Sequence, residues 1–584
     1  MSGGEYLVLV AHEPGAMARL GPRTDGVTRL EPVAFEGRAR VFAQTGCVHA
    51  AASRARHAVL LGSVFERHGS NDHSIELKGS VLELWLQGST DALLDRHWGG
   101  YVAVGSTGSA VRILRDPSGA MPCYYAATPG GVILGSSIMV LLEAGFERPA
   151  VEIDRVAQGL YRADLPGEAT ALSGIRELLP GDELVIDARS VDTLHRWSPW
   201  DHVAFEPDLG FAGHASVLRR AVQNTVAAWS RRFERVLVGV SGGLDSSIVA
   251  TCLQRPKPPV VGVTVATDDP IGDERDYART ICGHLGLELV EEKYESCDFG
   301  IARCARPNLP RPTGRTIAQV YDAAIMRALR YSGAQAFFTG NGGDNVFAFS
   351  HSAGALADRL LHDGISSGAL ATNRAIRQLT GCTAIEAWQS ALRLLRRPRR
   401  YQWRADRRML ASEVVAELDA QPLRHPWLDA PAGALPGKAA HIASLLRIQR
   451  HLDGTRQLGM ASLVNPLMSQ PIVETSLAVP SWMWCQAGQD RSVARHAFAD
   501  ALPRSIVERR SKGGPDGFVA RMLMQHRSAI TECLLDGSLA RHGIIDRPAL
   551  ERRLRSDRPD WGAERVRLFE LLEAEAWIDH WRAG

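Results

Sequence analysis

Residues 236–247 read Val-Leu-Val-Gly-Val-Ser-Gly-Gly-Leu-Asp-Ser-Ser, and this stretch decides the fold predicted for most of the chain. The β-branched run from Val236 to Val240 predicts a buried strand, and the apolar positions in residues 248–253 predict a helix directly after the loop. A strand, a glycine loop and a helix in this order direct free backbone N–H groups and the helix dipole toward one point. The stretch therefore predicts an anion site on an α/β fold.

The residues of this loop indicate which anion it binds. The two glycines let the backbone approach a ligand closely, and Ser241, Ser246 and Ser247 add hydroxyl donors. The loop is not a Walker A loop, because the Gly-Lys-Ser/Thr ending is missing, and it is not a Gly-x-Gly-x-x-Gly turn. Asp245 would repel a phosphate unless a cation lies between them, and Mg²⁺ fits that role. The alternative is an ordinary polar turn that caps the helix.

The composition is that of a globular protein with more than one domain. At 584 residues, with 45% hydrophobic and 23% charged residues, the chain exceeds the size of one ordinary core. A net charge of +2 argues against a dedicated nucleic-acid binder. Nine cysteines without a Cys-x-x-Cys pair argue against zinc, and no apolar run is long enough to span a membrane. With no signal-like N-terminal segment, we expect a cytoplasmic protein.

The pattern of predicted secondary structure changes once along the chain. The first part has turn signals and short strands, expected at Tyr6–Ala11, Ala58–Phe65, Tyr101–Val104, Val111–Leu114 and Glu183–Ile186. From about Gly213, strands alternate with helices, which predicts a parallel, doubly wound sheet. Its expected elements are strands at Val260–Val265, Leu287–Val290 and Ala336–Thr339 and helices at Asp273–Leu285 and Thr316–Tyr331. We expect domains at residues 1–205 and 206–584, joined near Trp197–Gly213, and mostly helices beyond residue 350.

Four segments, in order along the chain, resemble glutamine-dependent asparagine synthetases. Residues 115–125 are similar to the signature Arg-Asp-x-x-Gly-x-x-Pro-Leu-Tyr-Tyr, residues 134–137 to Phe-Ala-Ser-Glu, and residues 179–184 to a Leu-Pro-Pro-Gly turn. The loop at 241–247 matches the pyrophosphate loop of ATP pyrophosphatases, which transfer AMP to a substrate oxygen. The resemblance implies an N-terminal amidotransferase-like (Ntn) α/β/β/α sandwich followed by a doubly wound synthetase domain.

The N-terminal part departs from that family at the residues that would release ammonia. Ser2 stands where the family has the cysteine nucleophile of its glutaminase. The glutamine-binding Arg-Gly-Pro-Asp and Asn-Gly-Glu segments are also missing, and only Gly62-Ser-Val-Phe65 stands near the place of the second. We therefore expect a retained fold without its ammonia chemistry.

The segment Thr339–Asp344 implies a metal pair but no general base. It reads Thr-Gly-Asn-Gly-Gly-Asp, where asparagine synthetases have Gly-Glu-Gly-Ser-Asp and β-lactam synthetases have Gly-Tyr-Gly-Ser-Asp. Asp344 matches the second metal-binding aspartate, so the resemblance implies that Asp245 and Asp344 hold Mg²⁺ at adjacent strand ends. Asn341 replaces the glutamate or tyrosine, and a neutral amide cannot act as a base. The alternative for Asp344 is a turn aspartate that caps the next segment.

A late lysine completes the implied site. Arg510-Ser-Lys-Gly-Gly514 resembles the lysine motif of the synthetase domain, in which Lys512 would stabilise the adenylate and the following oxyanion. The alternative is a solvated lysine on a glycine turn. The implied catalytic residues are Lys512, Asp245 and Asp344. The resemblance further implies that ATP is bound by Val240, Ser241, Gly242, Gly243, Leu244, Asp245, Ser246, Ser247, Val265, Gly340, Asn341 and Gly342.

Among relatives that no longer accept ammonia, the chain looks most like lasso peptide cyclases. The residues that carry this likeness are Gly-Gly-Asp-Asn at 342–345, the helix start at 273–278 and Ser-Lys-Gly-Gly at 511–514. The likeness implies adenylation of an Asp or Glu side chain of a precursor peptide, followed by attack of the peptide's N-terminal amine. It also implies a leader-peptide protease and a leader-binding protein as partners. No nucleic-acid or membrane partner is expected.

Two rival functions and one unexplained segment remain open. A small-molecule amide or β-lactam synthetase would share every ATP residue. A silent nucleotide-binding scaffold would be expected to lose Asp245, Asp344 or Lys512, and all three are present. The segment Arg393–Arg408 contains eight arginines and is either a solvated helix face or a docking surface for an acidic peptide.

Overall fold

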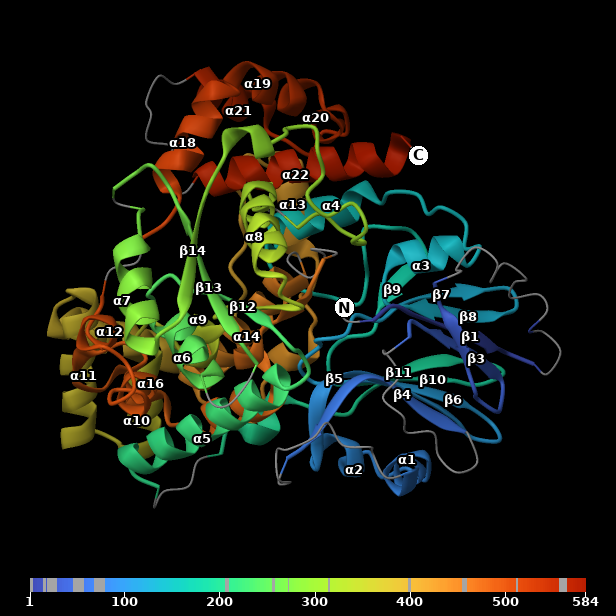
Figure 1. The fold of residues 1–584 in the computed structure, drawn as a ribbon. Coiled ribbons are helices and arrows are strands. Elements are labelled where there is room, and N and C mark those ends of the chain that lie inside the picture. Colours follow the sequence, from blue (N-terminus) through green and yellow to red (C-terminus); the bar gives the residue numbers. More distant parts are fainter. Residues whose placement is uncertain are drawn as a thin grey trace.

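The structure, a computed structural model, confirms the α/β class and has antiparallel sheets in its N-terminal part and a parallel sheet in the rest (Figure 1). It describes residues 4–13, 17, 29–45, 57–67, 79–204, 209–254, 258–270, 272–313, 316–397, 401–453, 460–510, 513–555 and 564–583. The predicted boundary between residues 205 and 206 lies outside these ranges and stays a prediction.

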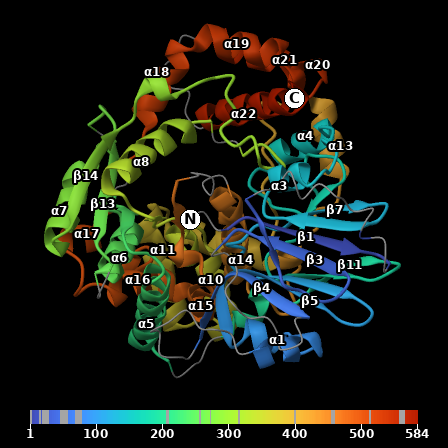
Figure 2. The ribbon, with the colours of Figure 1, turned by 45° about the vertical axis from the view of Figure 1, so that its right-hand side comes forward.

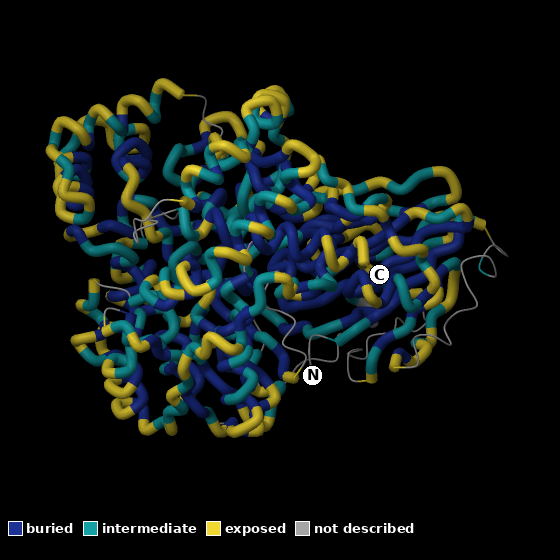
Figure 3. The backbone as a smooth tube through the Cα atoms, turned by 90° about the horizontal axis from the view of Figure 1, so that it is seen from above, coloured by how far each residue is buried: buried dark blue, intermediate teal, exposed yellow. Residues whose placement is uncertain are grey.

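The N-terminal part is a sandwich of two antiparallel sheets. One has the strand order β2-β3-β1-β8-β7-β9 and the other β11-β10-β6-β5-β4. Tyr6, Val8 and Val10 of β1 face the second sheet, while Leu7 and Leu9 face the outer helices, so β1 is buried on both sides. The strands of the sandwich form a dark, buried band when seen from above (Figure 3). This is the α/β/β/α layering that the sequence predicts.

Five of these strands, β1, β4, β5, β6 and β10, were predicted, and their bounds agree with the predicted ones to within a few residues; the other six were not predicted. The first sheet contains β1 (Tyr6–Ala11), β2 (Glu31–Val33), β3 (Ala39–Ala43), β7 (Tyr124–Thr128), β8 (Gly131–Gly135) and β9 (Ile175–Glu177). The second contains β4 (Ala58–Glu66), β5 (His97–Ser106), β6 (Val111–Arg115), β10 (Asp182–Ile186) and β11 (Val191–His195). The outer layers are α3 (Ile138–Glu143) with α4 (Ile153–Tyr161), and α1 (Gly79–Leu86) with α2 (Asp91–Leu94).

The second part is built on a parallel sheet with the order β14-β13-β12-β15-β16. Helices cover both faces, because side chains of α5, α6 and α7 pack on Val236 and Val238, whereas α8 packs on Leu237 and Val261. From β12 the chain first moves outward to β13 and β14 and then returns to the other side of β12 for β15 and β16. The doubly wound prediction is therefore confirmed, and β12 and β15 flank the point where the strand order reverses.

The bounds of this layer are as follows. Its strands are β12 (Val236–Gly239), β13 (Val260–Ala266), β14 (Glu288–Lys293), β15 (Ala336–Phe338) and β16 (Ser462–Val464). Its helices are α5 (Phe211–Ser230), α6 (Leu244–Leu253), α7 (Arg275–Leu285) and α8 (Ala318–Ser332). Helix α7 ends at Gly286, whose φ of 65° is left-handed, as the sequence pattern predicts.

The chain beyond residue 350 is mostly helical, as expected. Helix α9 (Gly343–Val346) precedes this part, and the α-helices within it are α10 (Gly354–Asp363), α11 (Ser367–Thr380), α12 (Ala384–Arg396), α13 (Ser412–Ala420), α14 (Pro436–Asp453), α15 (Gln470–Ala478), α16 (Ser492–Ala497), α17 (Arg504–Val507), α18 (Asp516–Gln525), α19 (Arg527–Asp536), α20 (Ser538–Arg541), α21 (Arg547–Arg555) and α22 (Glu564–Ala583). Within the described ranges, none of the helices has both the length and the apolar character needed to cross a bilayer.

The arginine-rich segment divides into two parts. Arg393 and Arg396 are exposed at the end of α12, and residues 398–400 lie outside the described ranges. In the second part, Arg407 forms an ion pair with Asp419 at 2.7 Å, so its charge already has an acidic partner in the same protein. The first part fits a solvated helix face, and its use as a docking surface stays a hypothesis.

Side chains from distant parts of the chain join the sandwich to the rest. Glu177 of β9 lies between Arg115 of β6, at 2.9 Å, and Arg311, at 2.6 Å, and all three are buried. Burial opposes ionisation of Glu177, but Arg311 and Arg115 outweigh it and lower the pKa of Glu177 to about 2. Helix α22 lies beside α4 in both views (Figures 1 and 2), and Arg567 donates to the Leu160 carbonyl at 2.8 Å.

Candidate active site

The glycine loop follows β12 and leads into α6. Gly242 has a left-handed φ of 63°, and a Cβ there would lie 2.2 Å from Cβ of Tyr277. Gly243 is the N-cap residue of α6, and the Ser246 hydroxyl donates to its carbonyl at 3.2 Å. The loop is therefore pressed against α7 on one side and leaves the start of α6 directed at the space beyond the strand ends.

A second loop touches the first from the end of β15. A Cβ on Gly340 would lie 2.6 Å from the backbone nitrogen of Ser246, so only glycine fits at this contact. The backbone nitrogen of Asn341 donates to the Thr339 hydroxyl at 3.1 Å. The two loops meet where the strand order reverses, which is where doubly wound sheets bind ligands.

These loops bring Asp245 and Asp344 to the same side chain, the guanidinium of Arg491. The Nη1 atom of Arg491 lies 3.1 Å from Oδ2 of Asp245 and 2.6 Å from Oδ1 of Asp344. Burial opposes the charge on Arg491, but the carboxylates of Asp245, Asp344 and Asp490 outweigh it and raise the pKa of its guanidinium. The site thus holds a fixed positive charge between the carboxyl groups of Asp245 and Asp344.

This donor set fits Mg²⁺ better than a metal with a full protein ligand set. Mg²⁺ commonly takes one or two carboxylates and completes its shell with phosphate oxygens and water. Within the described part of the chain, no group of three or more His, Cys, Asp or Glu side chains could hold a metal. Asp245 and Asp344 would hold the ion, and Arg491 shows that one cation can contact both.

Chain segments on both sides of Lys512 lie at the glycine loop. Arg509 donates to the Ser241 carbonyl at 2.9 Å, pairs with Glu274 at 2.7 Å and stacks 3.8 Å from the Tyr277 ring centroid. The backbone nitrogen of Gly513 donates to Glu274 at 3.0 Å. Lys512 itself lies outside the described residues, so its role stays a prediction.

A cavity of about 320 Å³ occupies the space between these groups. Most of the predicted ATP residues line it, namely Val240, Ser241, Gly243, Leu244, Asp245, Ser246, Val265, Gly340 and Asn341. The second predicted metal ligand, Asp344, lines it as well. Gly242, Ser247 and Gly342, which were also predicted, do not line it. The cavity is thus formed where the sequence predicts the nucleotide.

Phe349 lines both this cavity and a second one of about 330 Å³. The second cavity is lined by aromatic rings, small residues, two histidines and a single arginine, including Tyr401, Trp484, His351, His441 and Arg447. The Arg447 guanidinium lies 4.6 Å from the ring centroid of Trp403. A ligand here would lie beside the nucleotide cavity, among aromatic and aliphatic side chains on the one hand and hydroxyl and imidazole groups on the other.

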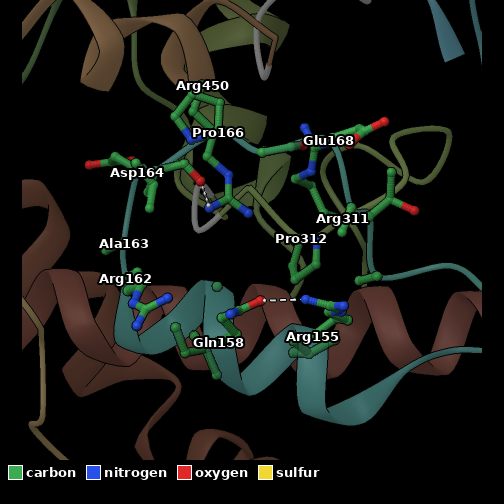
Figure 4. Close-up of a pocket in the computed structure, with 18 of the residues that line it drawn as sticks. Arg155, Gln158, Arg162, Ala163, Asp164, Pro166, Glu168, Arg311, Pro312 and Arg450 are labelled. Carbon is green, nitrogen blue, oxygen red and sulfur yellow. Dashed lines mark hydrogen bonds between the residues drawn. The ribbon is translucent and has the colours of Figure 1, made fainter. Parts of the chain in front are cut away.

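A third cavity, of about 340 Å³, lies away from both and shares no lining residue with them (Figure 4). It is bordered by α4, the loop that follows it and Arg450. Its arginines have partners within the chain, since Arg155 donates to Gln158 at 3.0 Å and Arg450 to the Leu165 carbonyl at 3.3 Å. We assign this cavity no ligand.

The N-terminal signature at residues 115–125 has a structural role here. Arg115 pairs with Glu177, and Asp116 accepts hydrogen bonds from the backbone nitrogens of Tyr101, at 3.1 Å, and Ser118, at 2.8 Å. Both residues of the signature are fully buried in the sandwich. Ser2 lies outside the described residues, so its predicted lack of glutaminase activity stays a prediction.

The family of this protein follows from a family model that matches the part of the chain with the parallel sheet and the nucleotide cavity. The family model described as "Asparagine synthase" matches residues 217–579. The chain belongs to the asparagine synthase family. This membership places it among ATP-dependent ligases and agrees with the predicted enzyme class.

Individual proteins give more limited likenesses. The "Carboxyethyl-arginine beta-lactam-synthase" of Streptomyces clavuligerus is 30% identical over 190 residues, which cover 32% of this chain and 34% of that protein. The chain thus spans about a third of that relative's length in the match. Solved structures of an "allosteric regulatory enzyme of purine biosynthesis" and of the "glutamine phosphoribosylpyrophosphate (PRPP) amidotransferase from B. subtilis" match at 12% and 10% identity.

The two structural matches carry no argument about this chain. The first covers 52% of this chain and 82% of the other with a TM-score of 0.23, and the second covers 49% and 65% with a TM-score of 0.21. The fold class therefore rests on the observed sheets and on the family match.

Sequence reasoning missed four charged side chains at the site. Arg491, Asp490, Arg509 and Glu274 line the nucleotide cavity, and all four take part in ion pairs there. Arg509 stands close to the lysine motif and could have been included on that ground. Arg491 has no local signal, because it reaches Asp245 from 246 positions away in the sequence.

Proposed function

We propose that this protein closes a macrolactam ring in a precursor peptide. It adenylates an Asp or Glu side chain with ATP, and the peptide's N-terminal amine then attacks the acyl-adenylate, which releases AMP and completes an isopeptide bond. The observation that carries this proposal is a pair of cavities that share Phe349 in their walls, one beside the carboxylate pair and one lined by both apolar and polar side chains. The first suits ATP and the second suits the side chain to be activated.

In the first step a substrate carboxylate attacks the α-phosphate of ATP, and pyrophosphate leaves. The backbone of the glycine loop and the start of α6 supply N–H groups and the positive end of a helix dipole for the departing phosphates. Mg²⁺, held by Asp245 and Asp344, would neutralise phosphate charge during this step. Arg509 fixes the loop through the Ser241 carbonyl, so the donors are positioned before ATP arrives.

In the second step the amine forms the C–N bond, the acyl–phosphate C–O bond breaks, and one proton must leave the nitrogen. Asn341 cannot accept this proton. His441 is buried, and burial together with nearby Lys438 lowers its pKa to about 3, so it is a poor base. His351 lines the same cavity and is exposed, and its ring meets Phe349 edge-on at 4.8 Å. We propose His351 as the proton acceptor and Lys512 as the group that stabilises the oxyanion.

A small-molecule amide or β-lactam synthetase is the second candidate. Two observations favour it: the relative from Streptomyces clavuligerus, and a second cavity of about 330 Å³, which is near the lower end of small-ligand pockets. A peptide would place one side chain in this cavity and the rest of its length outside it. The leader-peptide protease, the leader-binding protein and a cytoplasmic location belong to the first candidate and remain proposals.

The deciding experiment offers both kinds of substrate with ATP. Leader-free peptides with an internal acidic residue, and small carboxyalkyl amino acids, are incubated separately with the enzyme and analysed by mass spectrometry. Ring closure lowers the peptide mass by one water and blocks the N-terminal amine, and AMP appears with pyrophosphate. Asp245→Asn should abolish both signals because the metal site loses one of its carboxylates.

Two outcomes would contradict the proposal. ADP as the main nucleotide product would exclude adenylation. Dehydration of a small carboxyalkyl amino acid, with every peptide left unchanged, would exclude the peptide cyclase and support the second candidate.

A further inference from the structure

Arg491 occupies the position that the metal assignment gives to Mg²⁺. One nitrogen of its guanidinium contacts Asp245 at 3.1 Å and Asp344 at 2.6 Å. A surface arginine would sample many rotamers, but this side chain is only 13% exposed. The contact is therefore a built feature of the site.

The surroundings of Arg491 hold it in this position. Its backbone has a left-handed φ of 50°, which is uncommon for a residue other than glycine. Its Nε atom lies 3.2 Å from Asp490, and that carboxylate is also held by Arg495 at 2.6 Å. Its guanidinium lies 5.1 Å from the ring centroid of Phe349, the residue that separates the two cavities. The cation is thus fixed by its backbone, by a carboxylate and by a ring.

Two carboxylates at one point repel each other unless a positive charge lies between them. The protein supplies such a charge from its own chain, because the Arg491 guanidinium contacts both carboxylates. The same arrangement has a consequence for the metal. Mg²⁺ can bind both carboxylates only if the guanidinium moves away, and the guanidinium then needs another anion.

We propose that Arg491 is the counter-cation of the nucleotide-free site and that it makes Mg²⁺ binding depend on ATP. The phosphates of ATP accept the displaced guanidinium, so metal and nucleotide enter together and bare Mg²⁺ is kept out. Arg491 acts through the aspartates and is a positioning residue. The proposal rests on the proposed function, because it uses Asp245 and Asp344 as the metal ligands.

Isothermal titration of MgCl₂ into the full-length protein without nucleotide tests this directly. The wild-type protein should show no saturable binding at millimolar Mg²⁺. Arg491→Met should bind Mg²⁺ alone about tenfold more tightly or better, which corresponds to about 1.4 kcal/mol of removed competition. The variant should also melt at a lower temperature than the wild type, and Mg²⁺ alone should restore its stability.

Arg509→Met is the matched control, because it removes the same charge from the same cavity without a contact to the aspartates. It should bind bare Mg²⁺ no better than the wild type. Arg491→Lys keeps a positive charge and should also exclude bare Mg²⁺, so it tests the idea if the methionine variant does not fold. Equal Mg²⁺ affinity in the wild type and Arg491→Met, or an equal gain in Arg509→Met, overturns the proposal.

A further titration tests the counter-cation proposal separately from the assignment of Asp245 and Asp344 as Mg²⁺ ligands. Mg²⁺ is titrated in the presence of a non-hydrolysable ATP analogue, with Asp245→Asn and Asp344→Asn as comparisons. If neither substitution weakens binding of the metal–nucleotide complex, the metal pair is wrong and the proposed function fails with it. If both weaken it but Arg491→Met gains no affinity for bare Mg²⁺, the counter-cation proposal alone fails.

Discussion

Substitution of Gly242 by alanine should damage the glycine loop far more than the same change at Gly243. At Gly242 the φ of 63° is left-handed, and the new Cβ would lie 2.2 Å from Cβ and 3.0 Å from Cα of Tyr277. At Gly243 the φ is −73°, and the nearest atom to a new Cβ is the Ser241 hydroxyl oxygen at 3.2 Å. The two changes add the same methyl group to adjacent positions of one loop.

The structure sets the expected size of each effect. A left-handed alanine costs about 1–2 kcal/mol, and overpacking against a backbone that cannot yield costs about 1–3 kcal/mol. Gly242→Ala should therefore lower the free energy of unfolding by about 2–5 kcal/mol. Gly243→Ala should lose about 1 kcal/mol or less, because alanine is only a poorer N-cap than glycine.

Thermal unfolding of the three proteins without nucleotide measures the difference, and titration with an ATP analogue measures its effect on the site. We expect the melting temperature to fall by several degrees for Gly242→Ala and to change little for Gly243→Ala. ATP affinity should also fall more for Gly242→Ala, because the loop must move away from α7. Equal melting temperatures for the two variants would refute the reasoning, since only one of them meets a backbone.

Three further results are expected. Lys512→Ala should slow product formation by about 10²- to 10³-fold while ATP binding is retained, measured by rapid quench and titration, and a matching loss of ATP affinity would place the lysine on the nucleotide instead. Ser2→Ala should leave synthesis unchanged, and an enzymatic glutamate assay should detect no glutamate released from glutamine by either protein. Burial raises the pKa of Glu573 to about 7, so its neutral form stabilises the fold below pH 4.5 and that stabilisation is lost as the pH rises toward 7. Glu573→Gln should flatten the fall in melting temperature over that interval, and an unchanged pH profile would contradict the assignment.

Local patterns were sufficient where a segment carried its own signal. The sequence predicts β1 at Tyr6–Ala11 and the end of α7 at Gly286, because a short continuous apolar run and a helix-ending glycine are local properties. The predicted start of α7 at Asp273 is two residues early. The Asp273 carboxylate accepts a hydrogen bond from the backbone nitrogen of Arg275 at 3.0 Å, and Asp273 itself precedes the first residue of the helix.

Features that depend on distant partners could not be predicted in this way. The strand β16 has three residues, Ser462–Val464, and only its pairing with β15 defines it. The loop at 240–247 and Asp344 were found because they carry motifs. Arg491 was not found, because its role arises only when the fold brings it to two aspartates that lie far away in sequence.

The ion pairs of Glu177 give a reason why an N-terminal sandwich could be retained in a protein that no longer released ammonia from glutamine. Its carboxylate neutralises Arg115 within the sandwich and Arg311 from beyond it, and breaking a buried ion pair typically costs about 3–5 kcal/mol. A lineage that no longer uses ammonia can exchange its glutamine-binding residues one at a time at little cost to folding. Deleting the layer beneath them would cost more, because Arg311 would lose its ion pair with Glu177. The sandwich is then expected to vary most on its outer surface and least where Glu177 contacts Arg311.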